Sequence, residues 1–137
     1  MAVTPNSIVT PQTPVSFTAV ATAGETAFHA PTGMVTLIDD ATENVNGLRL
    51  TSLYAIARAN VAALNCQLYR KVGSVYTLID SVLMSAVNPS ATVANPKADF
   101  GYSESNPLTL KAGVGLAVAI GTTTANGVTF KAHGGAY

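Results

Sequence analysis

The side chains that most often carry enzyme chemistry are few and scattered in this sequence. The two histidines, His29 and His133, lie far apart and form no HxxxH or HExxH pattern, whereas zinc catalysis commonly uses three protein ligands. Cys66 is the single cysteine, so neither an intrachain disulfide nor a cysteine-based zinc site is expected. Its neighbours Asn65 and Gln67 cannot serve as the base that a nucleophilic thiolate needs. We therefore predict a buried structural thiol and no catalytic, cofactor-binding or metal-binding residue.

Two further patterns resemble known sites without matching them. Asp39, Asp40 and Glu43 form the only acidic cluster, but adjacent strand residues point to opposite faces, and the DxDxDG spacing of a calcium loop is missing. A surface turn is the expected role, with calcium binding as the alternative. Gly113-Val114-Gly115 lacks the third glycine and the following helix of a nucleotide-binding loop. An enzyme is therefore not expected.

Charge is scarce over the whole chain. Seven Lys and Arg balance seven Asp and Glu, and charged residues make up 10% of the sequence, against about 25% in ordinary soluble domains. Without a basic excess, neither nucleic acid nor an anionic membrane is an expected partner. Weak repulsion favours association, and interfaces are depleted in Lys and Glu. We expect other subunits to cover much of the surface; the alternative is a surface coated with Ser, Thr and Asn.

The aromatic and apolar residues do not predict a stacking site or a membrane segment. Tyrosines 54, 69, 76 and 102 could stack on sugars or bases, but with so few cationic neighbours we expect them to pack. The most apolar window, 114–120, is seven residues long, against the ~20 that cross a bilayer. Residues 1–14 hold no Lys or Arg and no continuous apolar stretch, so no signal peptide is expected.

Small β-branched and hydroxylated residues dominate, which favours strands. Alternating or continuously apolar segments predict about eight short strands. Nine segments are candidates for them: residues 15–22, 34–38, 48–59, 61–70, 75–84, 98–102, 108–110, 114–120 and 127–133. Segment 48–59 also fits a helical face; the Asn-Gly turn before it favours a strand. Segment 27–30 could pair as well. In 61–70, even-numbered residues such as Cys66 should face the core, and odd-numbered ones such as Gln67 and Tyr69 should face outward.

These elements predict an all-β chain, an antiparallel β-sandwich with the jelly roll as the leading architecture. Residues 15–137 would form the single β-sandwich domain, with a long loop at 86–96 and a tail at 134–137. Residues 1–14, with three prolines and no periodic apolar face, predict an extended N-terminal arm. The arm is either a frayed terminus or a contact laid on a neighbouring subunit through Ile8, Val9 and Pro11.

Several short motifs near the C-terminal end resemble those of a known group of proteins. They are Leu108-Thr109-Leu110, Val114-Gly115-Leu116, Gly121-Thr122-Thr123, Ala125-Asn126-Gly127 and Gly134-Gly135-Ala136-Tyr137. Together they resemble small tailed-bacteriophage virion structural proteins of the head-decoration (cement) type, which have a jelly-roll fold and often end in a glycine pair, a polar or acidic residue and an aromatic. The resemblance covers residues 45–137, more loosely at the hairpin 61–84, and Ala136 departs from the acidic residue of that pattern.

This resemblance implies a non-enzymatic protein on the capsid exterior, without cofactors. It implies a homotrimer that cements junctions between subunits of the major capsid protein. Candidate contact residues to the capsid or to other subunits are Ile8, Val9, Pro11 and the terminal Tyr137. The alternative is a tail, neck or fibre component that contacts host surface carbohydrate through loops such as 86–96.

Overall fold

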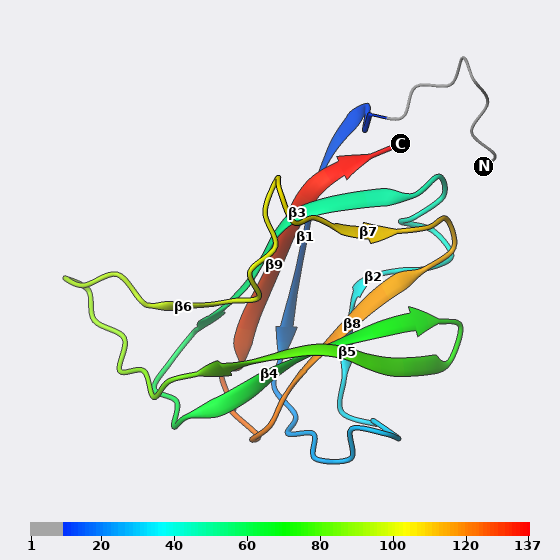
Figure 1. Cartoon of the computed structure of the whole chain (residues 1–137). Coiled ribbons are helices and arrows are strands. Elements are labelled where there is room, and N and C mark those ends of the chain that lie inside the picture. Colours follow the sequence, from blue (N-terminus) through cyan, green and yellow to red (C-terminus); the bar gives the residue numbers. More distant parts are fainter. Residues whose placement is uncertain (1–9) are drawn as a thin grey trace.

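The computed structural model describes residues 10–137, and over these residues the chain is all-β, with two antiparallel sheets packed face to face (Figure 1). Sheet A has the order β1 (Thr13–Ala21), β9 (Val128–Ala136), β3 (Leu48–Ala57), β6 (Lys97–Asp99), and β7 (Leu108–Leu110) also pairs with β3. Sheet B has the order β2 (Val35–Ile38), β8 (Gly115–Ile120), β4 (Leu64–Val72), β5 (Val75–Met84). The predicted antiparallel β-sandwich is confirmed.

The strands pair in a nested way along the chain. The first strand pairs with the last, β2 with β8, β3 with β6 and β7, and β4 with β5 in a hairpin. Strand β9 also pairs with β3, and β8 pairs with β4, so these pairs join into two continuous sheets. This order is that of a jelly roll, a double-sheet arrangement that contains two Greek keys.

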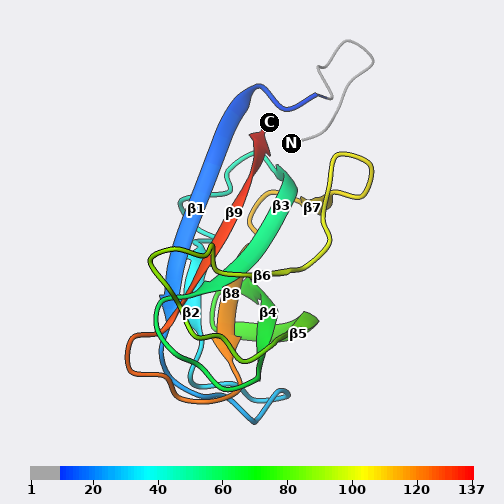
Figure 2. The same cartoon turned by 90° about the vertical axis from the view of Figure 1, so that its left-hand side faces the viewer.

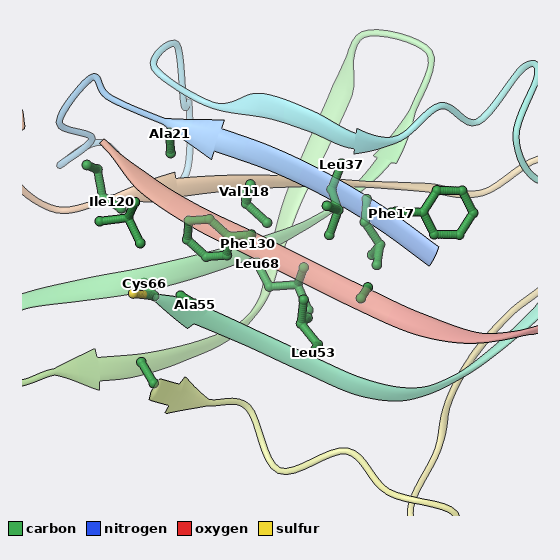
Figure 3. Close-up of a cluster of buried hydrophobic side chains, with 14 of the residues drawn as sticks. Phe17, Ala21, Leu37, Leu53, Ala55, Cys66, Leu68, Val118, Ile120 and Phe130 are labelled. Atoms are coloured by element: carbon green, nitrogen blue, oxygen red, sulfur yellow. The ribbon is translucent and has the colours of Figure 1, made fainter. Parts of the chain in front are cut away.

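The core lies between the sheets and follows the alternation of the sequence (Figure 3). In β9, Val128, Phe130 and Ala132 are fully buried, as predicted for the inward face. The ring of Phe130 lies 6.4 Å from that of Phe100, centroid to centroid. All six residues of β8 are buried, which agrees with its continuously apolar sequence.

The outer face of β4 alternates as predicted, but it is buried. Gln67 and Tyr69 alternate outward, away from the core, but neither is exposed to solvent. Tyr69 packs with Ala117 and Ala119 of β8, and Met34 lies against this cluster. The segment between β1 and β2 supplies the cover, because the backbone carbonyl of Glu25 reaches Gln67. Alternation alone does not reveal a loop that folds over the second face of a sheet.

Several element ends also differ from the prediction. Strand β4 begins at Leu64 rather than residue 61, β3 ends at Ala57, and β6 spans Lys97–Asp99 rather than 98–102. Segment 27–30 is a turn, in which the Ala30 N–H donates to the Ala27 carbonyl at 3.0 Å. None of the described residues forms a helix long and apolar enough to cross a membrane.

The first and last strands are both longer than predicted. Strand β1 includes Thr13 and Pro14, two residues that the sequence assigned to the arm. Proline fits there because β1 is an edge strand of sheet A. Strand β9 continues through the predicted tail to Ala136. At Gly134 a side chain would collide with the carbonyl of Arg49 on β3, so glycine allows β9 to run on between its neighbours.

Candidate docking interface

The described start of the chain and its C-terminal residue lie together at one end of the sandwich (Figures 1 and 2). Thr13 pairs with Ala136, and the Gln12 N–H donates to the Ala136 carbonyl at 2.8 Å. The Tyr137 N–H donates to the carbonyl of Gly47, which precedes β3, at 3.1 Å. We call this end, made of residues 10–14, 134–137 and Gly47, the terminal pole.

Two glycines shape the terminal pole, Gly135 through a close approach and Gly47 through its backbone conformation. The half-buried Pro11 lies over Gly135, where an added Cβ would collide with the proline ring. Gly47 has a φ of +104°, a backbone conformation that favours glycine, and its α-carbon faces the ring of Tyr137. Pro11 and Tyr137 are therefore both held in place at the terminal pole by contacts to the sandwich.

A shallow concave surface of about 450 Å³ lies beside Pro11. It is lined by Pro11, Gln12 and Thr13, by Arg49 and Glu104, and by His133. The Arg49 guanidinium donates to the Glu104 carboxylate at 3.1 Å and to the Glu104 carbonyl at 2.7 Å, so these two charges are paired. Such a surface can contact a partner through hydrogen bonds and small apolar groups, with little net charge.

The structure brings together two of the four candidate contact residues. Pro11 and Tyr137, far apart in the sequence, both belong to the terminal pole. Ile8 and Val9 lie outside the described residues. Both residues lie at the same end of the sandwich, and a partner contact through them stays a prediction.

The residues considered for catalysis are not brought together. His29 lies between β1 and β2, at the opposite end of β1 from the terminal pole, whereas His133 lies in β9 near that pole. Cys66 is fully buried in the core, and desolvation raises its pKa to about 12. Within residues 10–137, no three His, Cys, Asp or Glu side chains are placed to hold a metal ion.

The acidic cluster closes a turn after β2. Asp40 pairs with Lys71 of β4, and its carboxylate also accepts the Gly73 N–H at 2.6 Å. The hydrogen bond to Lys71, followed by that from Gly73, lowers the pKa of Asp40. The Glu43 carboxylate accepts the Asp39 N–H at 2.9 Å. These carboxylates are used within the fold, which agrees with the predicted turn.

The tyrosines are distributed over different faces. The ammonium of Lys97 lies 4.4 Å from the ring centroid of Tyr54 in sheet A, whereas Tyr69 is buried on sheet B. The Tyr102 hydroxyl donates to the Asp80 carboxylate at 2.9 Å. Burial, and then this hydrogen bond, raise the pKa of Tyr102 to about 12. These contacts favour the packing role that the sequence indicated.

Sequence reasoning missed the buried carboxylate of Glu25. It accepts the N–H of Ala27 at 3.0 Å, that of Gly33 at 2.8 Å and that of Thr32. These hydrogen bonds, with that from Gly33 first, lower the pKa of Glu25. The available signal was a lone acidic residue in a segment of small residues that ends in Pro-Thr-Gly, where free backbone N–H groups need an acceptor.

Comparison with known proteins assigns no family. No model of a protein family matches the sequence, and a search of curated proteins finds no match. The resemblance to phage decoration proteins therefore remains a prediction from short motifs.

Proposed function

We propose that this protein is a non-enzymatic virion structural protein that decorates and cements the exterior of a tailed-phage capsid. Three copies associate, and the trimer binds over junctions between subunits of the major capsid protein. The terminal pole, through Pro11 and Tyr137, together with Ile8 and Val9 of the preceding segment, makes the contact with the capsid or with neighbouring subunits.

One observation supports this proposal: Pro11 and Tyr137 lie at the same end of the sandwich, the terminal pole. Because β1 and β9 are paired along their whole length, this pole is held rigidly. A terminal segment that leaves such a pole can reach a neighbouring molecule while the sandwich stays folded. Three poles in one trimer would bind together and gain avidity without any single strong contact.

The composition supports the same proposal. With seven cationic and seven anionic residues in 137, the chain has little charge repulsion between copies. Exposed apolar side chains such as Val75 and Leu83 would be covered in an assembly.

The test uses phage heads stripped of this protein and the purified chain added back. Deletion of residues 2–11 spares β1, which begins at Thr13, so the variant should fold. We expect full occupancy of heads by the complete chain and loss of occupancy for the deletion variant. Val93→Lys, in the exposed 86–96 loop, is the matched control and should bind as the complete chain does.

Unchanged occupancy after the deletion would overturn the contact role of this end. The copy number per particle distinguishes head decoration from the alternative. Hundreds of copies agree with head decoration, whereas a handful would indicate a tail, neck or fibre component. Binding should also depend weakly on salt, because few charges are available. A steep loss of binding between low and moderate salt would contradict the proposed apolar contact.

A further inference from the structure

Strand β5 is a long edge strand with an apolar surface. Within residues 10–137 it pairs only with β4, so its other side leaves backbone N–H and C=O groups without a strand partner. Val75 and Leu83 are each 66% exposed, and Leu78 is 36% exposed. Its single charged residue, Asp80, already accepts hydrogen bonds from the Tyr102 hydroxyl and from the Ser81 N–H. Such an edge is a template for another extended segment.

Strand β1 offers a second edge of similar length. It spans nine residues against ten in β5, it pairs only with β9 in the described part of the chain, and it has no charged side chain. Val20 is 37% exposed on this strand, and Thr18 is exposed too. Lysine, which often protects edge strands from pairing, is absent from both edges. The one proline, Pro14, lies at the start of β1, so residues 15–21 keep their backbone N–H groups for pairing.

The two edges lie on opposite sides of the sandwich. In sheet A, β1 is at one end of the strand order, and in sheet B, β5 is at the opposite end, next to the side that carries β6 (Figure 2). They cannot pair within one molecule. A contact between unlike surfaces on opposite sides of a subunit repeats around a rotation axis and can close a ring.

We infer that copies of this chain join by edge pairing, with the β5 edge of one copy against the β1 edge of the next. The inference rests on the homotrimer of the proposed function for its number of copies. A second copy suits the β5 edge because its β1 strand is extended, uncharged and of matching length, so pairing brings no second ionised group beside Asp80.

The pairing of β5 with a second β5 is the competing arrangement. A bulge at Ile79 interrupts the register of β5 against β4, between Asp80 and Leu78. Two bulged strands would place two irregularities and two Asp80 carboxylates in one interface. Strand β1 pairs in unbroken register with β9 over its nine residues, which makes it the more regular partner.

The experiment uses two edge variants of the complete chain in sedimentation equilibrium. Leu83→Lys places a charge on the β5 edge, and Val20→Lys places one on the β1 edge. We expect each variant alone to fall from the trimer mass to the monomer mass at a concentration where the wild type is fully trimeric. An equimolar mixture should recover a two-chain species, because one intact β5 edge then meets one intact β1 edge.

Val45→Lys is the matched control, since Val45 is 69% exposed but lies between β2 and β3. It should stay trimeric. Circular dichroism checks that each variant is folded, and Thr18→Lys replaces Val20→Lys if that variant does not fold. Either edge variant remaining trimeric, a mixture without the two-chain species, or a monomeric wild type would overturn the inference.

This result can be separated from the proposed function. Occupancy of phage heads is measured independently with the same proteins. If the wild-type trimer does not bind phage heads, the proposed decoration is contradicted and the edge pairing still holds. If the trimer binds heads but neither edge variant dissociates it, the edge pairing is contradicted and the proposed decoration still holds.

Discussion

The side-chain amide of Gln67 donates a hydrogen bond to the backbone carbonyl of Glu25 at 3.0 Å, which joins the β1–β2 segment to the outer face of sheet B. The same amide nitrogen donates to Asn65 at 3.0 Å, and the Tyr69 hydroxyl donates to the Gln67 side-chain oxygen at 2.5 Å. Every buried side-chain N or O atom of residues 10–137 has a hydrogen-bond partner. Because these polar groups are satisfied, the segment is fixed on the sheet.

The first prediction concerns Glu25 and pH. Its pKa is lower in the folded protein than in the unfolded chain, so its stabilising effect is complete above the ordinary Glu pKa of about 4.3 and is lost as the pH falls through the folded value. Glu25→Gln should lower the free energy of unfolding at pH 7 by about 2 kcal/mol, since charge-assisted hydrogen bonds are lost. Urea unfolding at pH 7 and pH 3 measures both effects.

Glu104→Gln is the control, because that side chain is 84% exposed and pairs with Arg49 at the surface. Glu104→Gln should lower the free energy of unfolding by less than about 1 kcal/mol at pH 7. The Glu25 variant should lose less stability than the wild type between pH 7 and pH 3. An equal loss in both proteins would show that Glu25 does not carry the acid sensitivity.

The second prediction concerns the core. Phe130 is fully buried between the sheets, so Phe130→Ala should destabilise the protein by about 3–5 kcal/mol through lost burial and the cavity left behind. Phe28, which is 41% exposed, provides the same chemical change outside the core. Phe28→Ala should cost less than half as much in urea unfolding, and comparable losses would contradict the burial assigned to Phe130.

The third prediction concerns the contact between Pro11 and Gly135. A methyl group at position 135 would collide with the proline ring, so Gly135→Ala should displace residues before β1. We expect a lower free energy of unfolding in the complete chain and a smaller loss after deletion of residues 2–11. The comparison of the two backgrounds by thermal unfolding isolates this contact, and equal losses would count against it.

The fourth prediction concerns Tyr102. Its hydroxyl stays protonated and bound to Asp80 until the pH approaches 12. Because this pKa is higher than in the unfolded chain, the stabilisation by the contact is complete below the ordinary Tyr pKa of about 10 and is lost as the pH rises through about 12. Tyr102→Phe should cost about 1 kcal/mol at pH 7. In an absorbance titration, the variant should lose one of the late-ionising tyrosines, and an unchanged amplitude near pH 12 would contradict the contact.

The sequence predicts the strands of this fold better than it predicts the loops that cover them. Alternation identifies β9 through Val128, Phe130 and Ala132, and the continuous apolar run identifies β8, because inward-facing residues repeat with the period of the strand. The burial of Tyr69 is not predictable in this way. It depends on a loop whose position is set by Glu25 and Gln67, which are 42 residues apart in the chain.

The candidate interface was predictable only in part. Proline spacing and the terminal aromatic indicated Pro11 and Tyr137 separately, but their common pole follows from the pairing of β1 with β9. Gly134 and Gly135 were interpreted as a tail because glycine is typical of loops. In the structure they serve close approaches to Arg49 and Pro11, which are long-range contacts that local sequence does not encode.

The pairing of the first strand with the last also bears on how the protein is synthesised. Strands β1 and β3 both pair with β9, so sheet A cannot be completed until Val128–Ala136 has been synthesised. During translation only the β4–β5 hairpin can form from neighbouring residues. Folding is therefore expected to be slow, because sheet A depends on contacts between distant parts of the chain, and a prematurely terminated chain that lacks β9 should be cleared by cellular proteases.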